Sequence, residues 1–179
     1  MSNVVLIGMP GVGKSTVGVI LAKVLGYHFV DADILIQEQE DRLLREIIEE
    51  DGVDGFIEIE NRVNSRIQED NAVIATGGSV VYGKEAMENL SRIGTVIYLQ
   101  LDYEPLSTRL GDLKGRGVVL REGQTLQNLF DERTPLYDKY ADIVVNEAGM
   151  TVEETLEAIV EGLKKLGIAP GDRSKRRKK

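Results

Sequence analysis

The chain has 179 residues and a mass of 19.8 kDa, which fits one compact domain. It is 42% hydrophobic and 29% charged, which excludes a fibrous or disordered protein, and it has no cysteine, which excludes disulfides and thiol chemistry. The formal net charge is −8, but six of the 22 basic residues lie in Arg173–Lys179. The rest therefore carries 16 basic against 30 acidic residues, and this acidic body argues against a nucleic-acid partner.

Two features of the sequence bear on its location. No positively charged segment precedes the short apolar run at the start, as a secretory signal would require. No apolar stretch approaches the ~20 residues that span a bilayer. We therefore expect a cytoplasmic protein without a membrane partner. We also expect a monomer.

Short apolar runs alternate with longer amphipathic segments along the chain. The short runs, rich in β-branched residues, predict strands at Val4–Ile7, His28–Val30, Ala72–Ala75, Thr95–Leu101 and Asp142–Val145. The amphipathic segments predict helices over Lys14–Leu25, Leu43–Glu50, Phe56–Glu69, Lys84–Leu90, Tyr103–Leu110, Leu126–Tyr140 and Val152–Leu166. This alternation predicts an α/β protein whose parallel sheet is covered by helices on both faces.

The domain boundaries follow from composition. No linker divides residues 1–167, so we expect a single domain there. The stretch at about 111–123 contains four glycines and three cationic residues, which is typical of a lid loop. Residues 168–179 are predominantly basic and polar, and we expect a disordered tail.

A P-loop pattern, G-x-x-x-x-G-K-[ST], is matched at every fixed position by Gly8–Ser15, between a predicted strand and a predicted helix. Its glycines allow backbone N–H groups to surround phosphate oxygens at the N-terminus of the helix. Lys14 can reach the β- and γ-phosphates, and the Ser15 hydroxyl can bind Mg²⁺. The motif therefore predicts a nucleotide site made by Gly11, Val12, Gly13, Lys14, Ser15 and Thr16. The guanine pattern Asn-Lys-x-Asp is absent, which argues against a switch GTPase.

Acidic residues follow two of the predicted strands. Asp31 and Asp33 come at the end of the second strand, where ligands gather in open α/β sheets. Because alternate residues of an extended segment point the same way, we expect both carboxylates to face the γ-phosphate. The alternative is a surface turn with two solvated acids. Asp102 fits either a Walker B acid or the N-cap of the next helix, and the proline in that helix's first turn favours the cap.

The order and spacing of several motifs resemble the shikimate kinase family from Val4 to about Leu166. The motifs are the P-loop, Asp31-x-Asp33, Phe56 followed by Glu60, Thr76-Gly77-Gly78, Arg116 in the lid, and Arg133-x-Pro135-Leu136-Tyr137-x-x-x-Ala141-Asp142. The resemblance implies a three-layer α/β/α P-loop kinase fold with a five-stranded parallel sheet in the order 2-3-1-4-5. It also implies ATP- and Mg²⁺-dependent phosphorylation of a hydroxyl of a small carboxylic acid, with shikimate as the first candidate.

The resemblance assigns roles to single residues on the nucleotide side. The match to Asp31 implies that it holds Mg²⁺ together with Ser15. Arg116 is implied to swing from the lid towards the phosphates, where it joins Lys14. Arg109 matches a position that packs near the adenine. Lys14 and Arg116 thus belong to the implied catalytic set.

The acceptor side is assigned in the same way. Asp33 matches the residue that binds the substrate hydroxyls and polarises the attacking one, so it completes the implied catalytic set. Gly77 and Gly78 match glycines whose backbone approaches the substrate. Arg133 matches the arginine that binds the substrate carboxylate, a role that suits a planar, bidentate guanidinium.

Three positions depart from the family pattern. Ile57 stands where the family has an arginine that shares the carboxylate, which removes a charge-assisted bond of about 1.5–3 kcal/mol. Ser79 replaces the third glycine of a triplet, and Gly117 follows Arg116 where the family has proline, so we expect a looser lid hinge. Two alternatives therefore stay open: a paralogue that phosphorylates another small alcohol, and a nucleotide-binding regulatory module without transfer activity. Arg42 and Arg45 are candidates to replace the lost arginine.

Overall fold

The structure is a computed structural model that describes residues 3–111 and 118–168. Arg116 and all but the first residue of the predicted tail lie outside the described residues. Five strands form one sheet: β1 (Asn3–Ile7), β2 (His28–Asp31), β3 (Ala72–Ala75), β4 (Gly94–Gln100) and β5 (Ile143–Asn146). All four neighbouring pairs are parallel, and the order is β2-β3-β1-β4-β5, which confirms the expected topology.

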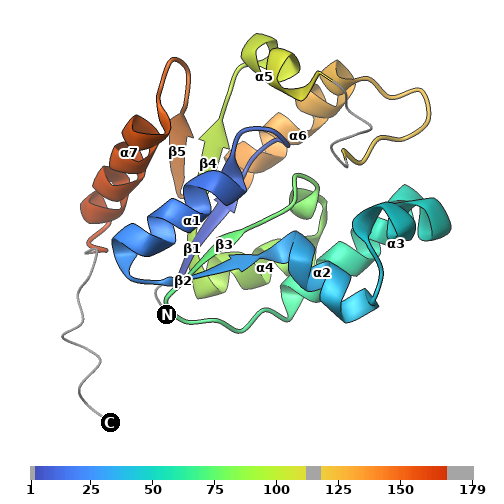
Figure 1. Cartoon of the computed structure of the whole chain (residues 1–179), viewed down its shortest axis with the longest axis horizontal. Helices are drawn as coiled ribbons and strands as arrows, with labels where there is room; N and C mark the ends of the chain where they lie inside the picture. Colours follow the sequence, from blue (N-terminus) through green and yellow to red (C-terminus); the bar gives the residue numbers. More distant parts are fainter. Residues whose placement is uncertain (1–2, 112–117, 169–179) are drawn as a thin grey trace.

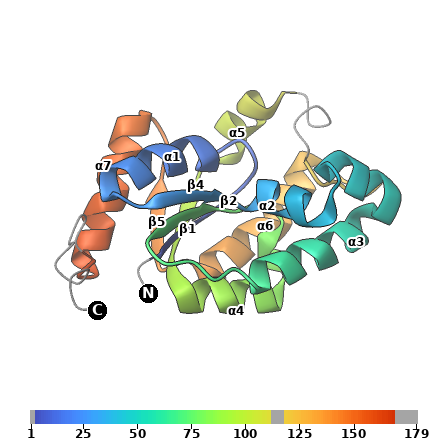
Figure 2. The same ribbon diagram turned by 60° about the horizontal axis from the view of Figure 1, so that its bottom comes forward.

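Helices cover both faces of this sheet, which gives the three expected layers (Figure 1). The first face carries α1 (Lys14–Leu25) and α7 (Val152–Lys165). The opposite face carries α4 (Lys84–Ile93) and α6 (Leu126–Tyr140), with α3 (Leu44–Ser65) packed against α4 (Figure 2). Every residue of β1 is buried because this central strand has helices above and below it, which explains its continuous apolar run.

The termini of the helices follow from local sequence signals. Thr125 and Thr151 begin α6 and α7, and the hydroxyl of each accepts a hydrogen bond from the backbone N–H three residues on. Gly26 ends α1 in the left-handed conformation, with φ of 68°. The short helices α5 (Tyr103–Leu110) and η1 (Val80–Tyr82) complete the fold. Asp102 occupies the N-cap position of α5, although its side chain makes no capping hydrogen bond.

The structure corrects the expectation for the segment after β2. Residues 32–40 form a helix, α2 (Ala32–Glu40), that the sequence analysis missed. Asp31 is its N-cap and accepts hydrogen bonds from the N–H groups of Asp33 and Ile34. Asp33 therefore lies in the first helical turn, and the argument from alternate residues of an extended strand was wrong. The signal that identifies α2 is the capping aspartate itself.

The two helices predicted at 43–50 and 56–69 are joined into α3, with a kink between them. Gly52 interrupts the helix with φ of 75° and ψ of 178°, a conformation that glycine adopts without a steric penalty. After this kink, the second half of α3 carries most of the buried residues of the helix, namely Phe56, Ile59, Glu60, Val63 and Asn64. No helix among the described residues is long and apolar enough to cross a membrane.

Candidate active site

The P-loop connects β1 to α1 and is shaped by its glycines. Gly11 and Gly13 have φ of 85° and 93°, values that favour glycine. A side chain on Gly8 would place its Cβ 2.6 Å from the carbonyl oxygen of Leu99. Thr16 lies in the first turn of α1, where backbone N–H groups have no partner within the helix. The loop is thus a cradle of backbone donors at a positive helix end.

Lys14 lies across this loop. Its Nζ donates to the carbonyl oxygens of Gly8 and Met9, at 2.8 and 2.9 Å. The side chain is buried, and burial lowers the pKa of the ammonium to about 8, although Asp33 opposes this shift. A buried cation whose hydrogen-bond partners in the described part of the chain are two carbonyl oxygens is suited to exchange them for anionic oxygens.

Asp31 connects the P-loop to α2. Its Oδ2 accepts a hydrogen bond from the Ser15 hydroxyl at 3.1 Å, while its Oδ1 accepts from the N–H of Asp33 at 3.0 Å. The structure therefore brings the two predicted metal ligands together. Burial and the neighbouring charge of Asp31 raise the pKa of Asp33 above its ordinary value, whereas Lys14 opposes the increase.

A small cavity next to the P-loop gathers the predicted acceptor residues. It is lined by Pro10, Asp33, Leu44, Phe56, Glu60, Gly77, Gly78, Ser79, Val119 and Arg133. Both glycines are required by space, because a Cβ on Gly77 would lie 2.8 Å from Asp33 Oδ1 and a Cβ on Gly78 would lie 2.9 Å from Arg133 Nη1. Asp33 and Arg133, predicted from distant parts of the sequence, thus line one cavity.

Arg133 is 1% exposed, so it is not a surface arginine. Its Nε donates to the Tyr82 hydroxyl at 3.4 Å, and its guanidinium lies 5.4 Å from the centre of the Tyr82 ring. Its Nη2 donates to the carbonyl oxygen of Val119 at 3.3 Å. Within the described residues, Arg133 forms no ion pair. A buried guanidinium without a carboxylate partner is suited to an anionic ligand.

Glu60 is a site residue whose surroundings the sequence analysis did not predict. It is 1% exposed, and its Oε1 accepts a hydrogen bond from Ser79 at 2.5 Å. Its Oε2 has no hydrogen-bond partner among the described residues and faces Gly77, whose added Cβ would lie 2.6 Å away. Burial raises the pKa of Glu60 to about 7, against the opposing effect of the Ser79 hydrogen bond. The Glu60–Ser79 pair links two of the family motifs through a residue that departs from the family pattern.

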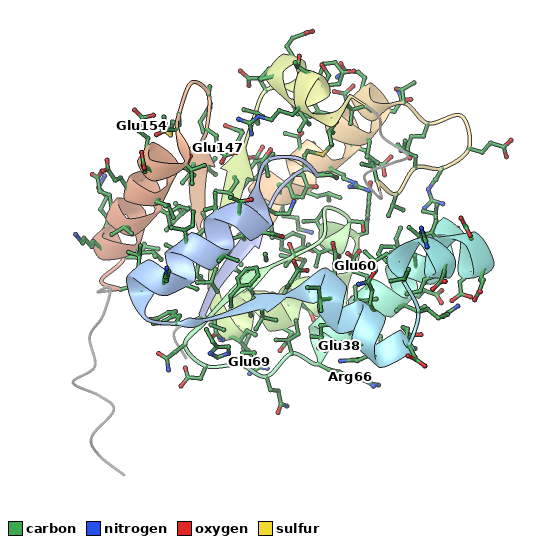
Figure 3. The ribbon with its side chains drawn as sticks, viewed as in Figure 1. Glu38, Glu60, Arg66, Glu69, Glu147 and Glu154 are labelled. Carbon is green, nitrogen blue, oxygen red and sulfur yellow. The ribbon has the colours of Figure 1, made fainter. Side chains whose placement is uncertain are left out.

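Glu147 is a second buried carboxyl, and it follows β5. Figure 3 shows Glu147 near the start of α1, whereas Glu60 lies farther along the sheet, beside α2. Burial raises the pKa of Glu147 to about 7, and the charges of Arg109 and Lys14 oppose this increase. Arg109 is exposed in the last turn of α5, and its charge acts on Glu147. Val12, another residue of the predicted nucleotide site, is buried within the P-loop.

Neither candidate replacement for the missing arginine reaches the cavity. Arg42 pairs with Glu50 and Asp51 at 2.7 and 2.8 Å. Arg45 is exposed on α3 and lines neither of the cavities beside Arg133.

Comparisons with known proteins agree with this geometry. The family model described as shikimate kinase matches residues 10–164. A shikimate kinase of Clostridium botulinum is 38% identical over 92% of this chain and 98% of its own, and one of Synechococcus is 38% identical over 95% and 88%. The solved shikimate kinase of Acinetobacter baumannii, in complex with shikimate, superposes with a TM-score of 0.84 at 29% identity, over 93% of this chain and 94% of that one.

The fold, the P-loop and the adjoining acceptor cavity define a small-molecule kinase of the P-loop class. The chain belongs to the shikimate kinase family. Membership of this family implies that it uses ATP.

Proposed function

We propose that this chain transfers the γ-phosphoryl group of ATP to a hydroxyl of shikimate, with Mg²⁺ as the metal ion. The observation that carries the proposal is the single cavity that holds Asp33 and Arg133 next to the P-loop residue Pro10. The carboxylate of Asp33 can accept a hydrogen bond from a hydroxyl group, and the guanidinium of Arg133 can bind a carboxylate. The two side chains therefore fit the two ends of a small hydroxy acid. Relatives named shikimate kinase, and a neighbour that contains shikimate, support this acceptor.

The P-loop fits a triphosphate because its glycines leave a cradle lined by backbone N–H groups. We assign the phosphates to the N–H groups of Gly11, Val12, Gly13, Ser15 and Thr16. Lys14 exchanges its two carbonyl partners for β- and γ-phosphate oxygens. We expect Arg116 to bring a second positive charge to these phosphates. Arg109 faces the base end of the nucleotide, opposite Glu147.

Ser15 and Asp31 fit Mg²⁺, because a hydroxyl and a carboxylate are the oxygen ligands that this ion prefers. Their ligating atoms, Oγ and Oδ2, already lie 3.1 Å apart. Oδ1 of Asp31 accepts a hydrogen bond from the N–H of Asp33 in the first turn of α2, so we assign Oδ2 to the ion. When bound, Mg²⁺ neutralises charge on the phosphates.

The acceptor hydroxyl donates to Asp33, which takes its proton as the hydroxyl oxygen bonds to the γ-phosphorus and the bond from that phosphorus to the β–γ bridging oxygen breaks, which releases ADP. The backbone of Gly77 and Gly78 lies against the body of the acceptor, and Arg133 holds its carboxylate at the other end. Transfer then requires only positioning and charge neutralisation, which suits a loose phosphoryl transition state.

Ile57 favours a second candidate function. An apolar side chain stands where the family places a cation, so the pocket also fits a small alcohol with a different group at that end. In this case the same P-loop and Asp33 perform the transfer, and only the acceptor differs.

Release of ADP, measured by a coupled assay with ATP and Mg²⁺, distinguishes the candidates. Shikimate, sugar acids and polyols serve as the acceptor panel. We expect the largest kcat/KM with shikimate. Higher turnover with a non-carboxylic polyol would favour the second candidate. ATP binding without transfer to any acceptor would contradict both and favour a regulatory module.

A further inference from the structure

A second small cavity lies on the other side of Arg133, and it contains the position of the missing arginine. Its walls include Ile57 from α3, Tyr82 from η1, Glu132 and Arg133 from α6, and Arg121 from the described C-terminal end of the predicted lid loop. The two cavities share Val119 and Arg133, so they adjoin one another. Arg121 is therefore a second guanidinium on the carboxylate side of Arg133, on a different segment from the one used by the family.

The backbone of Arg121 is well anchored beside this cavity. Its N–H donates to Gln124 Oε1 at 3.1 Å, and its carbonyl oxygen accepts from the N–H of Gln124 at 3.0 Å. This closed turn leads directly into α6, the helix that carries Arg133. The two arginines are therefore held on one continuous segment of chain, which fixes their relative position better than two unconnected elements would.

The present partner of Arg121 is easily replaced. Its Nη2 lies 2.7 Å from Asp54 Oδ1, but the two side chains are 52% and 78% exposed. Exposed ion pairs contribute little to stability because water screens them. A carboxylate bound against buried Arg133 is less solvated and therefore attracts a nearby guanidinium more strongly.

The charge balance of the cavity also allows an anion. Glu132 is the carboxylate on its wall, and Oε1 of Glu132 accepts a hydrogen bond from the Tyr82 hydroxyl at 2.5 Å. The pKa of Arg121 is raised mainly by its hydrogen bond to Asp54 and by the charge of Asp54, and to a smaller extent by the charge of Glu132. Arg121 and Arg133 together outweigh this single carboxylate. The residues that line the cavity therefore carry a net positive charge, whereas Asp54, the partner of Arg121, lies outside the lining.

We propose that Arg121 supplies the second guanidinium for the carboxylate of the acceptor and thereby compensates for Ile57. The inference rests on the proposed function, since it concerns the same acceptor site. It makes Arg121 a specificity-determining residue, because its contact favours acids over neutral alcohols. Acceptor binding would break the Arg121–Asp54 pair.

The first test compares the steady-state kinetics of Arg121→Ala with those of the unmodified chain, using shikimate as the acceptor. We expect the KM for shikimate to rise about tenfold or more, with kcat and the KM for ATP changed by less than about twofold. Arg45→Ala is the matched control, because it removes an exposed arginine that does not line the cavity. An unchanged KM for shikimate in Arg121→Ala would overturn the inference.

Rescue from position 57 gives a second, independent readout. Ile57→Arg introduced into Arg121→Ala should return the KM for shikimate to within about threefold of its original value. Ile57→Arg alone should change it by less than about threefold, because two guanidiniums already face the carboxylate. A tenfold gain from Ile57→Arg alone would mean that Arg121 does not occupy this role.

The carboxamide of shikimate separates a charge contact from a general disturbance of the pocket. The unmodified chain should prefer the acid to the carboxamide, and Arg121→Ala should lose about tenfold of this preference. An equal loss with both acceptors would overturn the inference. Failure of the unmodified chain to bind or phosphorylate shikimate would instead refute the proposed function, so the two failures are distinguishable.

Discussion

The nucleotide half of the site is formed by the backbone of one segment, whereas the acceptor half is formed by side chains from several elements. The P-loop is a contiguous segment whose shape comes from glycine backbone at 8, 11 and 13, and it matches the general pattern at every fixed position. The acceptor half is made by side chains from α2, α3, the β3–α4 connection, the lid end and α6. Both departures in the cavity, Ile57 and Ser79, fall in this second half.

The difference follows from how each half recognises its ligand. Backbone N–H groups bind phosphate regardless of the side chains around them, so the loop only has to keep its glycines and its lysine. Side-chain recognition can be redistributed, because a guanidinium can reach the same point from another segment. Exchange of side chains is therefore easier to accommodate in the acceptor half than in the P-loop.

Removal of the P-loop cation should produce the largest effect. Lys14→Ala should lower kcat by about 100- to 1,000-fold, because a donor to the developing charge is lost from a buried site. Shikimate binding, measured by calorimetry, should persist, because the acceptor cavity is intact. Lys23→Ala, an exposed change on the same helix, is the control. Near-normal turnover of Lys14→Ala would remove the distinction between the halves.

An added methyl group should disturb only the acceptor half. The Cβ of Gly77→Ala would lie 2.6 Å from Glu60 Oε2 and 2.8 Å from Asp33 Oδ1, so both carboxyl groups must move. We expect kcat/KM for the acceptor to fall by about 100-fold, as is typical of a small misplacement of reacting groups. Nucleotide affinity should change little. Gly162→Ala on α7 is the control, and a large loss of ATP binding in Gly77→Ala would show that the halves are not separable.

The smallest expected effect concerns stability and pH. Burial raises the pKa of Glu60 to about 7, so the folded protein holds this proton more tightly than the unfolded chain. Its contribution is therefore favourable at low pH and is lost as the pH rises towards 7. The side chain at position 60 of Glu60→Gln cannot ionise. The free energy of unfolding of this variant, relative to that of the unmodified chain, should therefore increase by about 1–3 kcal/mol from about pH 5 to about pH 8.

Urea denaturation at the two pH values measures this gain as a difference between the two proteins. Glu58→Gln, which removes an exposed carboxylate of the same helix, should follow the unmodified chain. Parallel pH dependence of Glu60→Gln and the unmodified chain would contradict the raised pKa of Glu60. Both proteins contain Glu147, whose pKa is also raised, so its contribution to the pH dependence cancels when one is subtracted from the other.

Most of the fold could be predicted from the sequence because its central strands β1, β3 and β4 are largely buried and form apolar runs. The strand predicted at Ala72–Ala75 has the observed bounds, and the strand order also agrees with the expectation. Helix α2 was missed because its amphipathic pattern is weak and the acidic pair was interpreted as the end of a strand. An aspartate that caps a helix and an aspartate that binds a metal ion look alike in sequence, and Asp31 fits both descriptions.

The site was predictable where a residue is part of a local pattern. Lys14, Ser15, Asp33 and Arg133 were named from motifs, and the structure brings them to one region. The Glu60–Ser79 hydrogen bond and the position of Arg121 were not predictable, because they depend on how α3 approaches the β3–α4 connection and the C-terminal end of the predicted lid loop. Such contacts arise from tertiary packing and leave no periodic signal in the chain.

Asp31 divides its two oxygens between the two halves, and this has a thermodynamic consequence. Its Oδ2 accepts from Ser15 of the nucleotide loop, while its Oδ1 fixes the first turn of α2, where Asp33 lies. A charge that approaches Oδ2 alters the electron density on Oδ1, because both atoms belong to one delocalised carboxylate. The binding free energies of the two substrates therefore contain a shared term. By reciprocity, whatever the first substrate does to the affinity for the second, the second does equally to the first.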